Sequence, residues 1–252
     1  MGKIFVSPGE ISDATIDITN PGDVHHLTRV LRVKCGDELE ISDGVKWEYV
    51  TRIEEIEKDR IVCRIEDRQA HSREPKTRVT LYQGFPKGAK MDTIIQKCVE
   101  LGAHEIVPVY MDRSIVTDTG KGEKKAERWQ KIADEAATQC RRGIRPNIAV
   151  PEKASKMFNS IVKHKLIVLP YENEEGRSLK DALADFRKNH PEDAEKGADI
   201  ALIIGPEGGF SDKEVACFRE AGAEVVTLGK TILRTETAGP AALAMIMYEL
   251  EL

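Results

Sequence analysis

The feature that most constrains the fold is a regular alternation of short apolar runs with helical segments, which begins at residue 78 and continues towards the C-terminus. The apolar runs are short and almost entirely hydrophobic, which is typical of strands in a sheet that helices cover on both faces. The alternation therefore predicts an α/β fold with a parallel sheet, whose ligand site lies at the carboxyl ends of the strands. We expect strands at 78–85, 105–111, 165–170, 198–205 and 223–229, and helices at 90–103, 126–143, 178–189, 211–222 and 237–250.

The first 70 residues follow a different pattern. Apolar and polar residues alternate in LEIS (39–42) and RIVCRI (60–65), and Asp43-Gly44 is a hairpin turn signal. One helical stretch interrupts the strands, DVHHLTRVLRV (23–33), in which Val24, Leu27, Val30 and Leu31 stand at helical spacing. This pattern predicts a small N-terminal β-barrel.

A polar segment with a proline, QAHSREPK (69–76), separates the two patterns. We expect the linker there, which gives an N-terminal domain of residues 1–72 and a C-terminal domain of residues 73–252.

The cysteines and histidines give no sign of a metal site. The five cysteines are far apart, odd in number and form no CxxC pair, and the adjacent His25 and His26 cannot share one helix face. No apolar run approaches the roughly 18 residues of a membrane-spanning helix, and no charged and then apolar leader is present. We expect a cytoplasmic protein that binds neither metal nor membrane.

The segment IGPEGGF (204–210) follows one of the predicted strands. Gly205, Gly208 and Gly209 remove side chains where the backbone turns tightly and approaches a ligand. A glycine turn before a helix often binds phosphate, but Glu207 places a negative charge inside this one. A neutral or cationic ligand fits the turn better. Ser211 and Glu214 have the spacing of a capping box for the next helix.

A second loop, LGKTILRTETAGPAA (228–242), follows the next strand. Gly-Lys-Thr at 229–231 imitates a phosphate-binding P-loop, but Glu224 stands where that motif requires glycine. The apolar pair Ile232-Leu233 has two interpretations: it fills the core, or it clasps a flat apolar ring beside the glycine loop.

The two loops together closely resemble those of the SPOUT methyltransferases of the RsmE family, which methylate ring nitrogen 3 of a uridine in 16S ribosomal RNA of the small subunit. The resemblance extends over nearly the whole chain, through HHLTRVLR, K-G-x-K-M-D at 87–92 and Q-C-x-R at 139–142. It implies a PUA-like, RNA-binding barrel, a SPOUT α/β domain with a trefoil knot, a homodimer, and S-adenosylmethionine as the methyl donor.

The resemblance also implies which residues bind the donor. The end of the strand at 165–170, the GPEGG turn and the LGKTILR loop would wrap it, mainly through backbone groups. The implied donor-binding residues are Leu169, Gly205, Glu207, Gly208, Gly209, Leu228, Gly229, Ile232, Leu233 and Arg234.

Removal of the imide proton from uridine nitrogen 3 calls for a base or for a cation that stabilises the developing anion. Arg234 and Glu236 are the candidate catalytic residues, with Glu207 third. A salt bridge of Arg234 with Glu236, or a place for Arg234 at a dimer contact, is the alternative.

Charge suggests where RNA binds. The net charge of −5 excludes a broad basic surface, but residues 76–150 hold 14 Lys and Arg against 9 Asp and Glu. We expect a local strip of phosphate contacts. The alternative for its members is that they are solvated charges at helix ends. The candidates are Arg29, Arg32, Lys87, Lys90, Arg141 and Arg142.

Three functions remain open at this stage. The first is methylation of small-subunit ribosomal RNA, the second is methylation of transfer RNA by a related SPOUT enzyme, and the third is a non-catalytic RNA-binding role in ribosome assembly. The intact glycines and the complete ILRTETA segment favour an enzyme.

Overall fold

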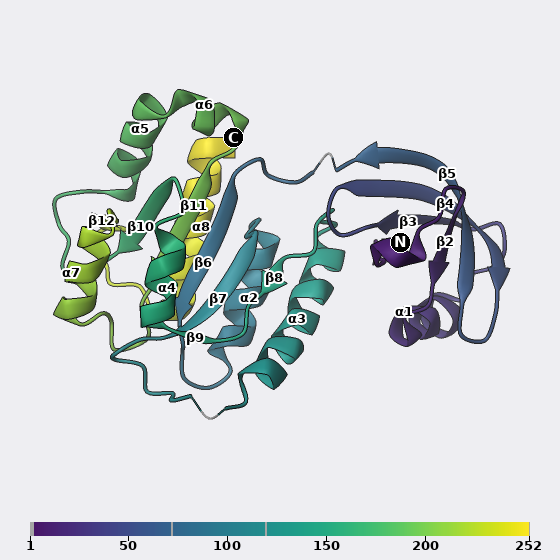
Figure 1. The fold of residues 1–252 in the computed structure, drawn as a ribbon, viewed down its shortest axis with the longest axis horizontal. Coiled ribbons are helices and arrows are strands. Elements are labelled where there is room, and N and C mark those ends of the chain that lie inside the picture. The colour runs from purple at the N-terminus through teal and green to yellow at the C-terminus, as the bar shows by residue number, and fades with distance from the viewer. Residues whose placement is uncertain (1–2, 72, 119, 252) are drawn as a thin grey trace. The chain divides into compact units, whose positions relative to one another are not determined.

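The computed structural model describes residues 3–71, 73–118 and 120–251 (Figure 1). Contacts within the chain form two compact units, Met1–Glu74 with Ala137–Arg145, and Pro75–Ala136 with Pro146–Leu252. The segment Ala137–Arg145 therefore packs with the N-terminal residues, although it follows them by more than sixty positions in the sequence.

The first unit is built on a five-stranded sheet. The strands run in the order β1-β3-β4-β5-β2; β1 is parallel to β3 and every other pair is antiparallel. Their bounds are β1 Ile4–Phe5, β2 Thr15–Ile18, β3 Glu38–Ser42, β4 Trp47–Ile56 and β5 Ile61–Ala70. The alternating apolar side chains meet in one core. A small β-barrel was predicted for this part of the chain, and its β structure is confirmed as a small curled sheet.

The predicted hairpin turn joins β3 to β4. Asp43 Oδ1 accepts hydrogen bonds from the backbone N–H groups of Val45, Lys46 and Trp47, and Gly44 has a φ of +72°. Glycine adopts this left-handed conformation without the strain that a side chain would cause, which is why Asp-Gly fixes the turn here.

The predicted helix of the first unit is present but irregular. Asn20 caps α1 (Pro21–His25), and a π-helical turn, η2 (His26–Leu31), follows at once. Val24 and Leu27 are buried, whereas Val30 and Leu31 are exposed. A π turn holds more residues than an α turn, so the angle between successive side chains differs from that of an α-helix. The apolar face predicted from α-helical spacing is therefore correct for Val24 and Leu27 but not for Val30 and Leu31.

Glu74 binds residues 142–144 to the rest of the first unit. Its carboxylate accepts hydrogen bonds from Arg142 Nη2 at 2.8 Å and from the backbone N–H groups of Gly143 and Ile144 at 2.6 and 3.1 Å. Ser42 Oγ donates to the Gly143 carbonyl, and a Cβ at Gly143 would collide with the His71 ring. Arg142 thus has a buried anionic partner within this unit.

The second unit holds a parallel sheet with the strand order β12-β10-β11-β6-β7-β8, and β9 pairs with β7 (Figure 1). All the described pairings in this sheet are parallel, as predicted. The strands are β6 Arg78–Gly84, β7 Glu105–Tyr110, β8 Asn147–Ile148, β9 Glu152–Lys153, β10 Leu166–Pro170, β11 Asp199–Ile204 and β12 Glu224–Val226. Strands β8 and β9 were not predicted, because two residues are too few to show a pattern.

Helices cover both faces of this sheet. One face carries α8, which contacts β11 and β6 and packs against α2 and α5; α4 and α7 contribute to the core on the other. The bounds are α2 Lys90–Glu100, α3 Gly122–Gln139, α4 Ala154–Ile161, α5 Leu179–Asn189, α6 Pro191–Lys196, α7 Asp212–Glu220 and α8 Thr235–Glu251. Of these, α4 and α6 were not predicted. No described helix combines the length and the apolar character that a bilayer crossing requires.

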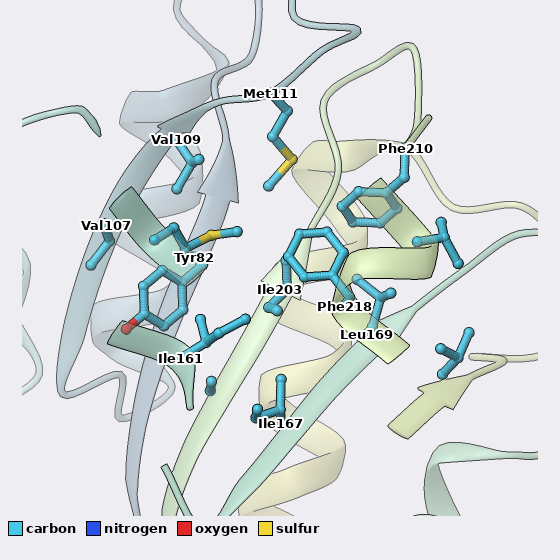
Figure 2. Close-up of a cluster of buried hydrophobic side chains, with 14 residues drawn as sticks. Tyr82, Val107, Val109, Met111, Ile161, Ile167, Leu169, Ile203, Phe210 and Phe218 are labelled. Carbon is cyan, nitrogen blue, oxygen red and sulfur yellow. The ribbon is translucent and has the colours of Figure 1, made fainter. Parts of the chain in front are cut away.

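Neighbouring residues of β6 pack against helices on opposite faces of the sheet. Tyr82 of β6 lies with Ile161 of α4, Ile203 of β11 and Phe218 of α7 in the core shown in Figure 2. Leu81, the residue before Tyr82, approaches α8 at Gly239 on the opposite face. Burial on both faces explains why the strands are apolar at every position.

We predict that Arg142→Ala lowers the free energy of unfolding by about 3 kcal/mol, because it leaves a buried carboxylate without its cation. The side chains of Arg142 and Glu74 are only 7% and 11% exposed. Urea unfolding measures the change, and Arg141→Ala at the exposed neighbouring position is the control. Equal losses in the two variants would contradict the structural role of Arg142.

Candidate functional site

Three adjacent strands end at one cavity. Because β11 pairs with β10, and β10 with β12, the segments that leave their carboxyl ends lie side by side. They enclose a cavity of about 530 Å³. Six of the predicted donor-binding residues line it: Gly205, Gly209, Leu228, Gly229, Ile232 and Leu233.

Four predicted donor-binding residues lie outside the wall of this cavity. Leu169 is fully buried in the core cluster, and Glu207, Gly208 and Arg234 are neighbours of lining residues without lining the cavity themselves. The segment after β10 contributes Tyr171, Glu172 and Glu175 instead. These three residues were not predicted, because their loop holds no motif that signals a ligand.

Glycines in these loops allow close packing of backbone on backbone. A Cβ at Gly84, the last residue of β6, would lie only 2.4 Å from the Pro206 nitrogen. At Gly209, which has a φ of +67°, a Cβ would lie 2.5 Å from Glu172 Oε1. The GPEGG turn therefore fits against β6 on one side and against the loop after β10 on the other.

A buried chain of hydrogen bonds fixes the turn to the start of α8. Gln83 Nε2 donates to Thr235 Oγ1 at 2.8 Å, and Thr235 Oγ1 donates to the Gly205 carbonyl at 2.6 Å. Gln83 is completely buried and Thr235 nearly so. No local pattern singles out Gln83, because it lies inside a strand whose sequence is typical of a buried core.

The capping box predicted after the turn is present. The Ser211 side chain accepts the Glu214 N–H, and the Ser211 N–H donates to Glu214 Oε2 at 2.9 Å. The second carboxylate oxygen, Glu214 Oε1, accepts the backbone N–H of Asp112 just beyond β7. One acidic side chain thus caps α7 and anchors the loop that follows β7.

Charged side chains gather beside the cavity. Lys90 Nζ lies 2.9 Å from Glu207 Oε1 and 3.3 Å from Glu236 Oε2. Burial favours the neutral form of Glu207, but hydrogen bonds from Lys90 and from backbone N–H groups outweigh it and lower the pKa of the carboxyl. The backbone N–H of Glu236 and the Lys90 ammonium lower the pKa of Glu236. The hydrogen bond to Glu207 raises the pKa of Lys90.

Arg234 makes only a loose ion pair. Its Nη1 lies 4.0 Å from Glu236 Oε1, and its side chain is 84% exposed. An exposed pair at this distance contributes little to stability. The salt-bridge alternative for Arg234 is therefore weak, and the guanidinium is accessible from solvent.

The predicted RNA-binding residues differ in exposure. Arg29, Arg32 and Arg141 are exposed in the first unit, whereas Arg142 is buried against Glu74. Lys87 is exposed in the second unit, and Lys90 forms ion pairs with Glu207 and Glu236.

Within the described residues, no group of three or more His, Cys, Asp or Glu side chains is arranged to hold a metal ion.

Comparison with known proteins agrees with this architecture. A family model described as an RNA methyltransferase domain matches residues 72–247, and one described as an RNA methyltransferase PUA domain matches residues 18–66. Ribosomal RNA small subunit methyltransferase E of Bacillus subtilis is 34% identical over 99% of this chain and 96% of its own. The protein of the same name from Synechocystis is 30% identical over 99% of this chain and 78% of its own.

A solved structure shows the same fold. Ribosomal RNA small subunit methyltransferase E from Neisseria gonorrhoeae, bound to S-adenosyl methionine, is 31% identical and superimposes with a TM-score of 0.82 over 98% of this chain and 97% of its own. The full-length match, the PUA unit and the parallel methyltransferase sheet lead to one conclusion. This chain belongs to the ribosomal RNA small subunit methyltransferase E family of RNA methyltransferases.

Proposed function

We propose that this chain transfers a methyl group from S-adenosylmethionine to ring nitrogen 3 of a uridine in 16S ribosomal RNA of the small subunit. The observation that carries the proposal is the cavity enclosed by the segments after β10, β11 and β12. Its position at the carboxyl ends of parallel strands is where α/β folds bind their ligands. The Neisseria relative with the same fold is bound to this donor.

The residues of the cavity fit the donor. A volume of about 530 Å³ lies within the range of small-molecule sites. Leu228, Ile232 and Leu233 offer an apolar surface for an adenine ring, and Glu172 and Glu175 place negative charge in the wall. Carboxylates suit a ligand that carries an ammonium and a sulfonium group. The wall thus combines the apolar and anionic surfaces that this ligand requires.

The donor, when bound, supplies an electrophilic methyl group on a cationic sulfur. In the reaction the N3–CH₃ bond forms as the S–CH₃ bond breaks, the bonding electrons remain on sulfur, and the imide proton passes to water. Nitrogen 3 lies on the Watson–Crick edge of uracil, so the target base must be unpaired or flipped when it reacts. The protein must therefore hold an open base beside the cavity.

We place the reacting centre at the start of α8. Arg234 and Glu236, the proposed catalytic residues, directly follow Leu233 and Thr235, which line the cavity. The exposed guanidinium of Arg234 is free to approach RNA, and the third candidate, Glu207, lies next to the lining residue Pro206. These positions support the assignment.

For RNA binding we propose contacts from both units to phosphate groups. Arg29, Arg32, Arg141 and Lys87 have the exposure that such contacts require. Arg142 is buried and paired, so its contribution is to position the neighbouring Arg141. We keep the proposed domain boundary between residues 72 and 73, with Glu74 and the segment Ala137–Arg145 packing with the RNA-binding unit.

We further propose a cytoplasmic homodimer with a trefoil knot in its C-terminal domain. A stripe of small and apolar residues on α8 supports the dimer, because it remains accessible whereas Gly239, Ala242, Leu243, Ile246 and Met247 of the same helix are buried. Met245 and Tyr248 are 42% and 70% exposed within it. The stripe consists of Thr237, Ala241, Ala244, Met245 and Tyr248.

We predict that Gly209→Val weakens binding of S-adenosylmethionine by at least about tenfold, roughly 1.4 kcal/mol. The new side chain would be strained at a φ of +67° and would collide with Glu172 at the cavity wall. Isothermal titration calorimetry measures the affinity. Gly176→Val is the control, since Gly176 lies in the loop after β10 but has neither a positive φ nor a clash. Unchanged affinity in Gly209→Val would contradict the placement of the donor.

We predict that labelled methyl from S-adenosylmethionine appears as 3-methyluridine in small ribosomal subunits that lack the modification. Nucleoside mass spectrometry identifies the product, and transfer RNA and naked ribosomal RNA are tested in parallel. Label in transfer RNA would favour a related transfer RNA enzyme. Absence of donor binding would favour the non-catalytic assembly factor.

We predict that Tyr248→Asp shifts the chain from dimer to monomer in sedimentation velocity, because it places a charge within the apolar stripe of α8. Val162→Asp alters another exposed apolar residue, 56% exposed after α4, and serves as the control. A dimer that survives Tyr248→Asp, or a wild-type monomer, would exclude the proposed interface.

A further inference from the structure

The ammonium group of Lys90 lies between two segments of the cavity wall. Lys90 is the first residue of α2, and its Nζ bridges Glu207 of the GPEGG turn and Glu236 of α8. The residues just before these carboxylates, Pro206 and Thr235, both line the cavity. Lys90 therefore places a positive charge at the edge of the cavity where the turn meets α8.

The groups around this ammonium fix its charge. Glu207 and Glu236 face it, Arg234 lies beyond Glu236, and the backbone N–H of Lys87 donates to Glu207. The pKa of each carboxyl is lowered and that of Lys90 is raised. At neutral pH the cluster thus contains an ammonium and two carboxylates. A carboxylate with a lowered pKa is a poor base for an imide whose pKa lies well above 7.

We propose that Lys90 is the cation that stabilises the uracil anion during methyl transfer, and that Glu207 and Glu236 are positioning residues that hold its ammonium at the cavity. This assignment rests on the proposed function and keeps the reacting centre at the start of α8. It gives the catalytic charge to Lys90 in place of Arg234 and makes Glu236 a positioning residue. In this mechanism no side chain of the protein acts as a general base. The Lys90 ammonium instead stabilises the deprotonated uracil electrostatically.

The donor capacity of the ammonium agrees with this role. An ammonium has three N–H donors. The hydrogen bond to Glu207 uses one of them, and the second faces Glu236 in an ion pair without a hydrogen bond. The third is available to a carbonyl oxygen of uracil, either O2 or O4, on which the negative charge of the anion develops. The N3 proton passes to water, nitrogen 3 attacks the methyl carbon, and the S–CH₃ electron pair stays on sulfur.

Lys90 suits this role better than Arg234 does. The Lys90 side chain is 33% exposed and held by two carboxylates, whereas Arg234 is 84% exposed and loosely paired. A charge that is fixed and partly shielded from water interacts more strongly with a developing anion than a mobile, solvated one. Arg234 is then free to contact the RNA around the target base.

The test compares Lys90→Met, Lys90→Arg and Lys97→Met on the RNA substrate that the wild-type chain methylates. Lys97 lies two turns along α2 and pairs only with Glu100 among the described ion pairs, so Lys97→Met controls for the loss of a helix charge. We expect Lys90→Met to lower kcat about 100-fold at pH 7, the effect of removing one donor to a developing anion. Lys90→Arg should retain most of the rate, and the KM for RNA and the Kd for the donor should change less than about threefold in every variant.

A second arm replaces uridine with 5-fluorouridine in the RNA. The fluorine makes the N3 proton more acidic and stabilises the anion, so it should supply part of what Lys90 supplies. We expect the ratio of wild-type to Lys90→Met rates to fall at least about tenfold on this RNA. The ratio of wild-type to Lys90→Met rates should also fall as pH rises. At higher pH the uracil anion forms without stabilisation by the Lys90 ammonium.

Two results would overturn the role of Lys90. An unchanged rate ratio on 5-fluorouridine RNA would show that Lys90 does not act on the uracil anion. A raised KM for RNA with an unchanged kcat in Lys90→Met would show that Lys90 binds an RNA phosphate and does not act in methyl transfer. Failure of the proposed function is a separate result, because the wild-type chain would then transfer no methyl to small-subunit RNA.

Discussion

The hydrogen bond from the Thr235 hydroxyl to the Gly205 carbonyl is the interaction on which the site depends. A hydroxyl has one proton, so Thr235 donates it to Gly205 and must accept the hydrogen bond from Gln83. This direction fixes the end of β6, the GPEGG turn and the start of α8 relative to one another. Loss of either partner would leave a buried polar group unsatisfied, at a cost of about 1–3 kcal/mol. Glycine at position 84 then lets the turn lie directly on the strand.

The charges at the edge of the cavity follow from the same geometry. Once the turn and α8 are held together, Glu207 and Glu236 lie close enough for one ammonium to bridge them. Two carboxylates without that cation would repel each other, and each would resist ionisation. Lys90 therefore stabilises the arrangement at rest and supplies the positive charge that a developing uracil anion needs. The structural and the proposed catalytic roles of Lys90 both come from the positive charge that Glu207 and Glu236 hold at the edge of the cavity.

Local patterns predicted most of the framework. Strands β6, β7, β10, β11 and β12 of the parallel sheet, the Asp43-Gly44 hairpin and the Ser211 cap were all predicted, although β12 is shorter than expected. Each of these features depends on residues close together in the sequence. The family to which the chain belongs was recognised from the paired loops for the same reason. Helix α4 was missed, since short helices carry too few apolar positions to show a period.

What the sequence did not show depends on contacts between distant residues. Glu74 lies near the predicted linker and gives no sign that it buries Arg142, 68 positions away. Lys90 reads as a basic residue near a loop until Glu207 and Glu236 are seen beside it. A charged residue in a sequence is thus assigned to solvent or to phosphate by default, and only the fold shows whether an acidic partner holds it.

The central claim is that the segments after β10, β11 and β12 form one donor site. Hydrogen–deuterium exchange of the backbone, measured with and without S-adenosylmethionine, tests it most directly, because ligand binding lowers local opening. We expect new protection in residues 171–175, 205–210 and 228–234 together, with no change in residues 147–153 around β8 and β9. Protection confined to one of the three segments, or located elsewhere in the chain, would contradict it.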